Sequence, residues 1–120
     1  MYNIYYDLGE SFLFSNPDSA LHFYDKSIVY AKKQQDELKE GESIRLQGVC
    51  FHLKSDYGQA LQFFQQTLTI AEKNSKLPTQ KEEAKKLQAK VINNIGIVYM
   101  FQDDYSMALD SYFKALTRIL

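Results

Sequence analysis

Residues 93–116, NNIGIVYMFQDDYSMALDSYFKAL, contain the pattern that decides the fold. A Gly follows an apolar residue, an aromatic residue comes three positions after the Gly, and an Ala-X-X-X-aromatic sequence begins twelve positions after it. Residues 46–68, LQGVCFHLKSDYGQALQFFQQTL, repeat this pattern with Gln47 in place of the apolar residue before the Gly. Residues 8–28, LGESFLFSNPDSALHFYDKSI, repeat it with one position fewer between the Gly and the Ala. Such self-similarity is typical of stacked helical hairpins. It favours a binding function over a catalytic one.

Each copy combines small residues with aromatic residues at fixed positions. The Gly and Ala positions are expected where two antiparallel helices approach closely, because a larger side chain would separate them. The aromatic residues are expected to fill the space beside that contact. Copy by copy, the motif positions are Tyr5, Leu8, Gly9, Phe12, Ala20 and Tyr24; Ile44, Gln47, Gly48, Phe51, Ala60 and Phe64; and Ile92, Ile95, Gly96, Tyr99, Ala108 and Tyr112.

Capping signals mark where helices begin. Asn16 followed by Pro17 predicts an N-cap and a first helical residue. Thr79 has a Glu three positions later, the spacing of a capping box, which predicts a helix that starts at Thr79. Asp56 and Asp104, each just before a Tyr, are the remaining candidate caps. We predict no strand, and helices over residues 2–14, 17–35, 38–53, 56–74, 80–101 and 104–119.

The pattern resembles the tetratricopeptide repeat (TPR), whose signature places an apolar site, Leu-Gly, Tyr, Ala and an aromatic residue on a helix-turn-helix. The resemblance implies a single all-α array: a right-handed superhelical stack of three helix-turn-helix hairpins with about six helices. Its repeats cover about residues 2–37, 38–76 and 79–120. The steps of 40 residues from Ala20 to Ala60 and of 48 from Ala60 to position 108 exceed the usual repeat of about 34 residues. Extended repeats of this kind are similar to those found beside kinases, cyclases and transcription regulators in bacterial signalling proteins.

The resemblance implies a concave groove lined by the first helix of each repeat. Lys and Asn on this face are similar to the family's groups that hold a peptide carboxylate, because ammonium and amide donors can converge on one anion. The first repeat instead offers Asp7 and Glu10, so a solvated helix face stays open as the other interpretation. The positions carried over as partner-binding are Tyr6, Glu10, Arg45, Val49, His52, Lys90, Asn93, Asn94, Ile97 and Phe101, with Asn3, Phe14 and Glu42 on the same faces.

The sequence predicts no catalytic, cofactor or metal site. His22 and His52 fall in different hairpins, without a third ligand at a metal-binding spacing. Cys50 follows Gly48 by two residues in an apolar helix, where a free Cys is expected to be a small buried hydrophobe. The glycines are isolated rather than grouped in a phosphate-binding loop. We therefore expect that the chain is not an enzyme.

Composition adds limits on partners and compartment. The chain has 120 residues and a formal net charge of −1, from 14 basic and 15 acidic residues, so neither a nucleic acid nor a membrane is an expected partner. No run of about eighteen apolar residues occurs, so the chain is expected to be soluble. A single Cys excludes an internal disulfide and leaves the compartment unassigned, with the cytoplasm favoured.

These observations predict a non-catalytic protein-protein or peptide interaction module, a scaffold within a larger signalling protein. The alternative is a peptide-sensing regulatory domain that controls an attached kinase, cyclase or DNA-binding domain. No polar capping helix follows the last predicted helix, so we expect a piece of a larger protein that forms a homodimer through this uncapped helix. The apolar residues expected at that contact are Met107, Leu109, Tyr112, Phe113, Leu116, Ile119 and Leu120.

Overall fold

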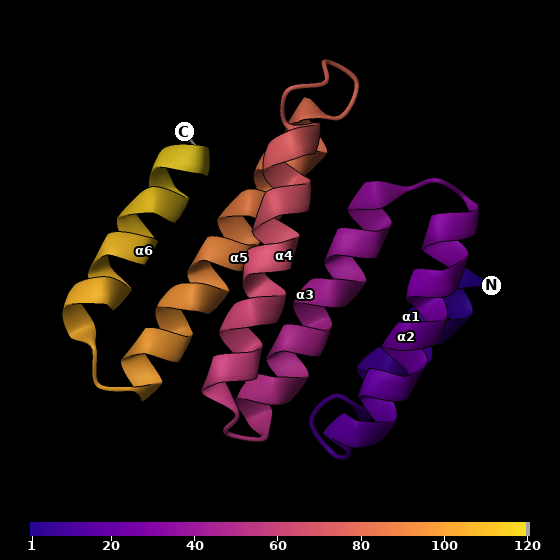
Figure 1. Cartoon of the computed structure of the whole chain (residues 1–120), viewed down its shortest axis with the longest axis horizontal. Helices are drawn as coiled ribbons and strands as arrows, with labels where there is room; N and C mark the ends of the chain where they lie inside the picture. Colours follow the sequence, from indigo (N-terminus) through magenta and orange to yellow (C-terminus); the bar gives the residue numbers. More distant parts are fainter. Residues whose placement is uncertain (120) are drawn as a thin grey trace.

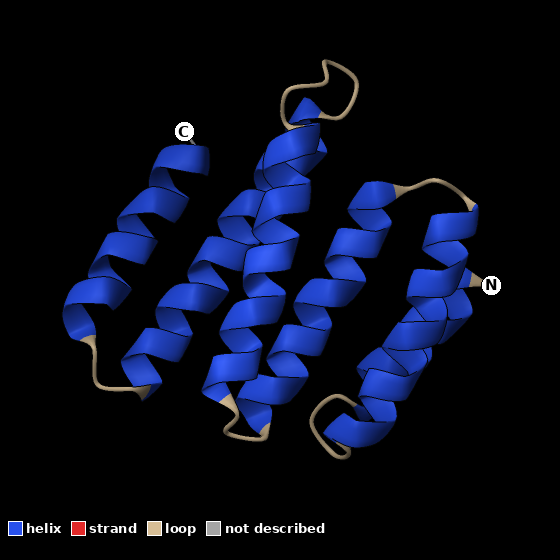
Figure 2. Cartoon of the chain, in the orientation of Figure 1, coloured by secondary structure: helices blue, strands red, loops and turns tan. Residues whose placement is uncertain are grey.

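The computed structural model describes residues 1–119, apart from the side chains of residues 115, 116, 118 and 119. Within this range the chain forms six helices and no strand (Figure 2), which confirms the predicted all-α fold. The helices pair in chain order as three hairpins, and each hairpin packs on the next (Figure 1). They are α1 (Tyr2–Phe12), α2 (Pro17–Lys33), α3 (Glu37–Leu53), α4 (Tyr57–Asn74), α5 (Lys81–Phe101) and α6 (Tyr105–Ile119).

The motif glycines lie where the two helices of a hairpin are closest. A β-carbon added at Gly48 would lie 2.6 Å from the ring of Phe64, which comes four residues after the buried Ala60. Close contact of this kind leaves no room for a side chain. The equivalent distances are 2.5 Å from Gly9 to Tyr24 and 3.1 Å from Gly96 to Tyr112. The structure thus confirms the predicted close approach, and each Gly faces an aromatic ring.

Three of the predicted helix caps are present. The side chain of Asn16 accepts a hydrogen bond from Ser19 N, with Pro17 as the first residue of α2. The same side-chain-to-backbone contact, at 3.2 Å, begins α4 at Asp56 and α6 at Asp104. An N-cap side chain satisfies a backbone N–H that has no partner in the first helical turn. These contacts explain where the second helix of each hairpin starts.

The predicted capping box at Thr79 is wrong. Helix α5 begins at Lys81, with Gln80 as its N-cap residue and without a side-chain cap. The backbone N–H of Gln80 donates to the carbonyl of Leu77 at 3.0 Å, which closes a turn around Pro78 and Thr79. Because Thr79 lies inside this turn, it cannot take the extended conformation of an N-cap residue.

The first hairpin turns differently from the other two, because α1 ends three residues after its motif Gly, whereas α3 and α5 each end five residues after theirs. In the α3/α4 turn, Ser55 has a φ of 63°, and Asp103 has a φ of 60° in the α5/α6 turn. A residue in this left-handed conformation commonly ends a helix. No residue of the α1/α2 turn, residues 13–16, has a positive φ. The residue missing from the first copy thus corresponds to the left-handed residue of the other two turns.

Polar side chains join the first hairpin to the second. Ser27 of α2 lies 2.7 Å from Ser43 of α3, Oγ to Oγ, and both residues are fully buried. Gln47 occupies the Leu position of the motif and is also buried, and its amide donates to Asp25 Oδ1 at 2.6 Å. Because buried polar groups are costly without partners, these contacts fix which residues of α2 and α3 meet.

The last helix leaves apolar side chains uncovered. Tyr105 is 62% exposed and Leu109 is 58% exposed. One repeat earlier, the equivalent Tyr57 and Leu61 are partly buried against a core that includes residues of α5. Helix α6 has no such neighbour among the described residues. Of the residues predicted for a homodimer, Tyr112 instead packs on Gly96, while Leu120 and the side chains of Leu116 and Ile119 lie outside the described residues.

The first helix presents a different outer face. Asp7 and Ser11 of α1 are exposed. The equivalent residues of α3, counted from the motif Gly, are Leu46 and Cys50, which are buried against α2. At these two positions α1 is therefore polar where α3 is apolar, whereas Ile4 on the same face of α1 is exposed and apolar.

Candidate partner-binding groove

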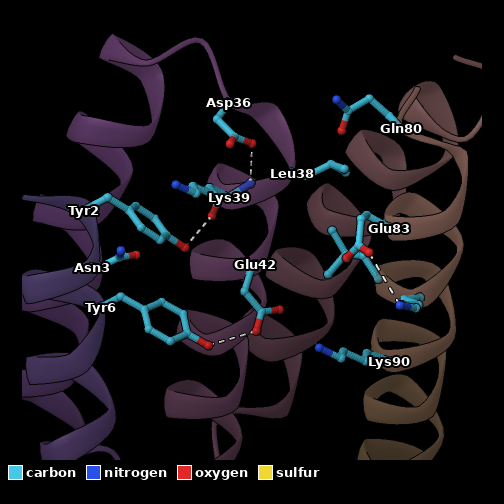
Figure 3. A pocket seen from close by; sticks show the side chains of 12 residues that line it. Tyr2, Asn3, Tyr6, Asp36, Leu38, Lys39, Glu42, Gln80, Glu83 and Lys90 are labelled. Carbon is cyan, nitrogen blue, oxygen red and sulfur yellow. Dashed lines mark hydrogen bonds and ion pairs between the residues drawn. The ribbon is translucent and has the colours of Figure 1, made fainter. Parts of the chain in front are cut away.

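A groove of about 420 Å³ lies between α1 and α5, with α3 between them (Figure 3). All three first helices contribute to it, so the groove depends on the whole array rather than on one hairpin. Its lining residues are Tyr2, Asn3 and Tyr6 from α1; Asp36, Leu38, Lys39 and Glu42 from the start of α3; and Gln80, Glu83, Lys86, Leu87 and Lys90 from the start of α5.

Two tyrosines form the α1 wall. The rings of Tyr2 and Tyr6 are stacked, with 5.7 Å between their centroids. The Lys39 ammonium lies 5.2 Å from the centroid of the Tyr2 ring, a cation-π contact, and the Tyr2 hydroxyl donates to the Lys39 carbonyl at 3.0 Å. Burial raises the pKa of Tyr2 to about 12, so its hydroxyl stays a donor at neutral pH. Because Tyr2 is buried and Tyr6 is half-buried, the aromatic surface of this wall comes mainly from Tyr6.

A chain of hydrogen bonds, here called the Glu42 bridge, crosses the face formed by the first helices. It consists of Tyr6, Glu42, Arg45 and Asn94. The Tyr6 hydroxyl donates to Glu42 Oε2 at 3.0 Å, and Arg45 donates to both carboxylate oxygens of Glu42, from Nε at 2.9 Å and from Nη2 at 3.1 Å. Arg45 Nη1 also donates to Asn94 Oδ1 at 2.9 Å. The bridge therefore links α1, α3 and α5.

The electrostatics of the bridge keep Glu42 charged and Tyr6 neutral. Burial raises the pKa of Glu42, but the hydrogen bond and charge of Arg45, together with the charge of Lys90, outweigh it and leave the pKa lowered. Burial and the neighbouring Glu42 carboxylate raise the pKa of Tyr6. At neutral pH the bridge consequently holds one carboxylate and one guanidinium, with Tyr6 as a neutral donor.

Two lysines supply the available charge of the groove. Lys90 is exposed on the α5 wall and, like Lys39, forms no ion pair among the described residues. The acidic side chains nearby have other contacts: Asp36 accepts a hydrogen bond from the backbone N–H of Lys39, and Glu83 pairs with Lys86 at 3.5 Å. The groove thus combines tyrosine rings with two ammonium groups, which suits a segment that carries apolar and acidic side chains.

The structure places only some of the predicted binding residues in the groove. Tyr6 and Lys90 line the groove, together with Asn3 and Glu42. Arg45 and Asn94 belong to the Glu42 bridge, so the Arg45 donors and the Asn94 Oδ1 acceptor are used by protein groups rather than by an open site. The remaining predicted residues do not line the groove: Val49 and Ile97 are half-buried, His52 and Phe101 pack together, and Glu10, Asn93 and Phe14 are exposed. Their role in binding stays a prediction.

Several groove residues were not predicted, among them Tyr2, Lys39, Lys86 and Leu87. Apart from Tyr2, they lie on segments that lengthen α3 and α5 beyond the usual repeat, DELKEGE and KEEAKKLQAK. The signal that could have found them is this extra length, because longer first helices raise the walls of the concave face.

An aromatic cluster lies near the α3/α4 turn, at the other end of α3 and α5. The His52 ring contacts Phe101 edge to face at 4.7 Å between centroids, and it contacts Tyr57 at 5.5 Å. Burial lowers the pKa of His52, so its imidazole is neutral at pH 7. His52 therefore joins α3, α4 and α5 through ring packing.

The described residues show little that suits covalent or metal chemistry. No group of three or more His, Cys, Asp or Glu side chains in this range could hold a metal ion. Cys50 is buried, and burial raises its pKa to about 12, which leaves it as an unreactive thiol at neutral pH. No helix in the same range is both long enough and apolar enough to span a membrane.

No family model matches the chain, and no curated protein matches it.

Proposed function

We propose that this chain is a TPR-type interaction module that binds a segment of a partner protein in the groove between α1 and α5. It acts as a non-catalytic scaffold within a larger signalling protein, with its hairpins in a right-handed superhelix. Three motif copies, each with a Gly against an aromatic ring, support the assignment to this repeat type.

The observation that carries the binding function is that one groove draws residues from all three first helices. Repeat arrays use such extended concave surfaces to bind other chains. The half-buried Tyr6 ring offers a rigid aromatic contact surface of the kind enriched in interfaces, with the buried Tyr2 ring stacked on it. The Lys39 and Lys90 ammonium groups orient an acidic residue. We infer a partner segment in which acidic residues lie next to apolar or aromatic ones.

Selection from a random peptide library displayed on phage tests this function. The full chain should enrich a family of acidic peptides with apolar side chains. These peptides should bind the Lys90→Glu variant about tenfold more weakly, because the reversed charge repels them. Lys85→Glu is the matched control: it makes the same charge change at an exposed residue of α5 that does not line the groove. Failure to enrich any family, or equal loss of binding in both variants, would refute the groove as the binding site.

A peptide-sensing domain that controls an attached kinase, cyclase or DNA-binding domain is the second candidate. The Glu42 bridge favours it, because this chain of hydrogen bonds ties the three first helices to one another beside the groove. A ligand that took Glu42 or Tyr6 from the bridge would change the spacing between α1, α3 and α5. Small-angle scattering with a selected peptide tests this: an unchanged radius of gyration at saturation would contradict sensing through curvature.

Self-association through α6 is a further part of the proposal. Tyr105 and Leu109 have no helix over them, although Tyr57 and Leu61 of the preceding repeat are partly buried. A two-fold contact between the α6 helices of two copies would cover these side chains. Asp110 and Lys114, which pair within α6 at 3.0 Å, could exchange partners across such an axis.

A further inference from the structure

A second surface on the molecule carries apolar side chains at one repeated position. The residue five positions after the motif Gly is exposed and apolar in all three copies: Phe14 is 80% exposed, Leu53 39% and Phe101 61%. We call these three residues the turn ridge. They lie at the hairpin turns, and Figure 1 shows the three turns along one edge of the array, the lower edge in that view.

Packing within the hairpins does not account for the turn ridge. The motif needs its Gly, Ala and aromatic positions for helix contacts, but Phe14 stands almost entirely in solvent. A polar residue would fit position 14 equally well, and Phe101 remains 61% exposed although its ring also contacts His52. Exposed apolar groups that recur over a surface mark interaction sites more often than isolated ones do.

The charges around the turn ridge indicate the chemistry of its partner. The three turn segments, residues 13–18, 53–57 and 101–105, contain four carboxylates and a single ammonium, Lys54, for a net charge of −3. The whole chain carries −1, so all remaining residues together carry +2. The edge is therefore the acidic part of the molecule, and it repels polyanions such as nucleic acids and anionic lipid surfaces.

We propose that the turn ridge docks a basic amphipathic helix of a partner protein. Apolar side chains of that helix cover Phe14, Leu53 and Phe101, and its Lys and Arg residues face Asp56, Asp103 and Asp104 of the turns. This is the recognition mode in which an amphipathic helix places its apolar face on a hydrophobic surface with opposite charges around it. The surface is separate from the groove between α1 and α5.

Fluorescence anisotropy with a labelled model peptide tests the proposal on the full chain. The probe is a blocked peptide of Leu and Lys, about 18 residues long, with its Leu residues on one helical face. The triple variant Phe14→Ser, Leu53→Ser, Phe101→Ser should bind it about tenfold more weakly than the parent. The control triple Ile4→Ser, Val29→Ser, Leu77→Ser removes exposed apolar side chains outside the turn ridge and should bind like the parent.

A second pair of variants tests the charges. Asp56→Asn, Asp103→Asn, Asp104→Asn removes the charge and keeps the caps, because Asn caps helices as well as Asp does. It should also weaken binding about tenfold, whereas Asp7→Asn, Glu40→Gln, Glu82→Gln, with the same change in net charge and outside both the groove lining and the turn segments, should not. Circular dichroism checks that every variant keeps its helices, and the single variant Phe14→Ser replaces the ridge triple if that one unfolds.

Three results would overturn the proposal: binding by the ridge variant equal to that of the parent, equal losses in the ridge and control variants, or equal affinity for a peptide with Glu in place of Lys. The groove variant Lys90→Glu should bind the Leu-Lys peptide like the parent. Because the two sites are far apart along α5, loss of one binding activity with retention of the other separates this proposal from the groove function.

Discussion

At the residue scale, the helix crossings differ in how much room they leave at each Gly. A β-carbon added at Gly48 would lie 2.6 Å from the Phe64 ring, and one added at Gly96 would lie 3.1 Å from the Tyr112 ring. A β-carbon added at Gly58 would have no such neighbour within 4 Å. The cost of an added methyl group should follow this order, because overpacking forces rings and backbone to move.

We therefore expect Gly48→Ala to lower the free energy of unfolding by about 1–3 kcal/mol, and Gly96→Ala to lower it less. Gly96→Leu should cost about 1–3 kcal/mol. Gly58→Ala should be neutral or stabilising, because Ala restricts the unfolded chain and meets no obstacle. Denaturant titration of the variants measures the order, and equal stability of Gly48→Ala and the parent would contradict the proposed contact.

The buried hydroxyl of Tyr24 is a second feature that affects stability. It has no hydrogen-bond partner among the described residues. The second copy of the motif has Phe64 at the same position. Because an unpaired buried polar group is destabilising, Tyr24→Phe should raise the free energy of unfolding by about 1 kcal/mol. Tyr112→Phe is the control and should bring no gain, since the Tyr112 hydroxyl donates to Met100 Sδ at 3.0 Å.

The Glu42 carboxylate predicts a dependence of stability on pH. Its pKa in the folded state lies below the ordinary value of 4.5, so its stabilising contribution is fully present above about pH 4.5 and is lost as the pH falls through the folded pKa. Glu42→Gln should cost about 1–3 kcal/mol at pH 7, because Arg45 and Tyr6 lose an ionised partner. The difference in the free energy of unfolding between Glu42→Gln and the parent should become smaller toward pH 3. Urea titrations at both pH values measure it, and a constant difference would contradict the role of the charge.

At the scale of elements, the turns within the hairpins store strain at defined positions. Ser55 adopts a left-handed φ of 63° to end α3, a conformation that costs a residue with a β-carbon more than it costs Gly. We expect Ser55→Gly to raise the free energy of unfolding by about 0.5–1 kcal/mol. Ser15→Gly in the α1/α2 turn, where no residue has a positive φ, should be neutral or destabilising. Thermal melts compare the two variants. A higher melting temperature for Ser15→Gly but not for Ser55→Gly would contradict the assignment of the left-handed residue to the α3/α4 turn.

The sequence was sufficient to predict the features that depend on residues close together along the chain. Asn16 and Asp56 cap helices through residues three positions away, and Gly48 faces a ring at a fixed spacing, so each signal can be read along the chain. The prediction that a helix starts at Thr79 was wrong because the turn around Pro78 competes with the capping box. The groove was harder to predict, because the partner of Arg45 on α5 is 49 residues away and no periodicity along one helix identifies it.

At the scale of the whole molecule, the exposed face of α6 predicts association between copies. Sedimentation over a dilution series should show a monomer-dimer equilibrium for the parent chain. Leu109→Asp should abolish the dimer, because it places a charge in the centre of the apolar face. Val29→Asp, at a half-exposed apolar residue of α2, should dimerise like the parent. A monomer at every concentration of the parent would refute the contact.

The unlike outer faces of α1 and α6 bear on how far such assembly can proceed. A head-to-tail contact, with α1 of one copy on α6 of the next, would repeat without closing and produce fibres. That contact would bury Asp7 and Ser11 where the array itself uses Leu46 and Cys50. Removing an unpaired carboxylate from water is costly, so polymerisation is blocked at the α1 end. If two copies associate through α6, we therefore expect assembly to stop at two copies, and a solution held at high concentration should stay free of filaments.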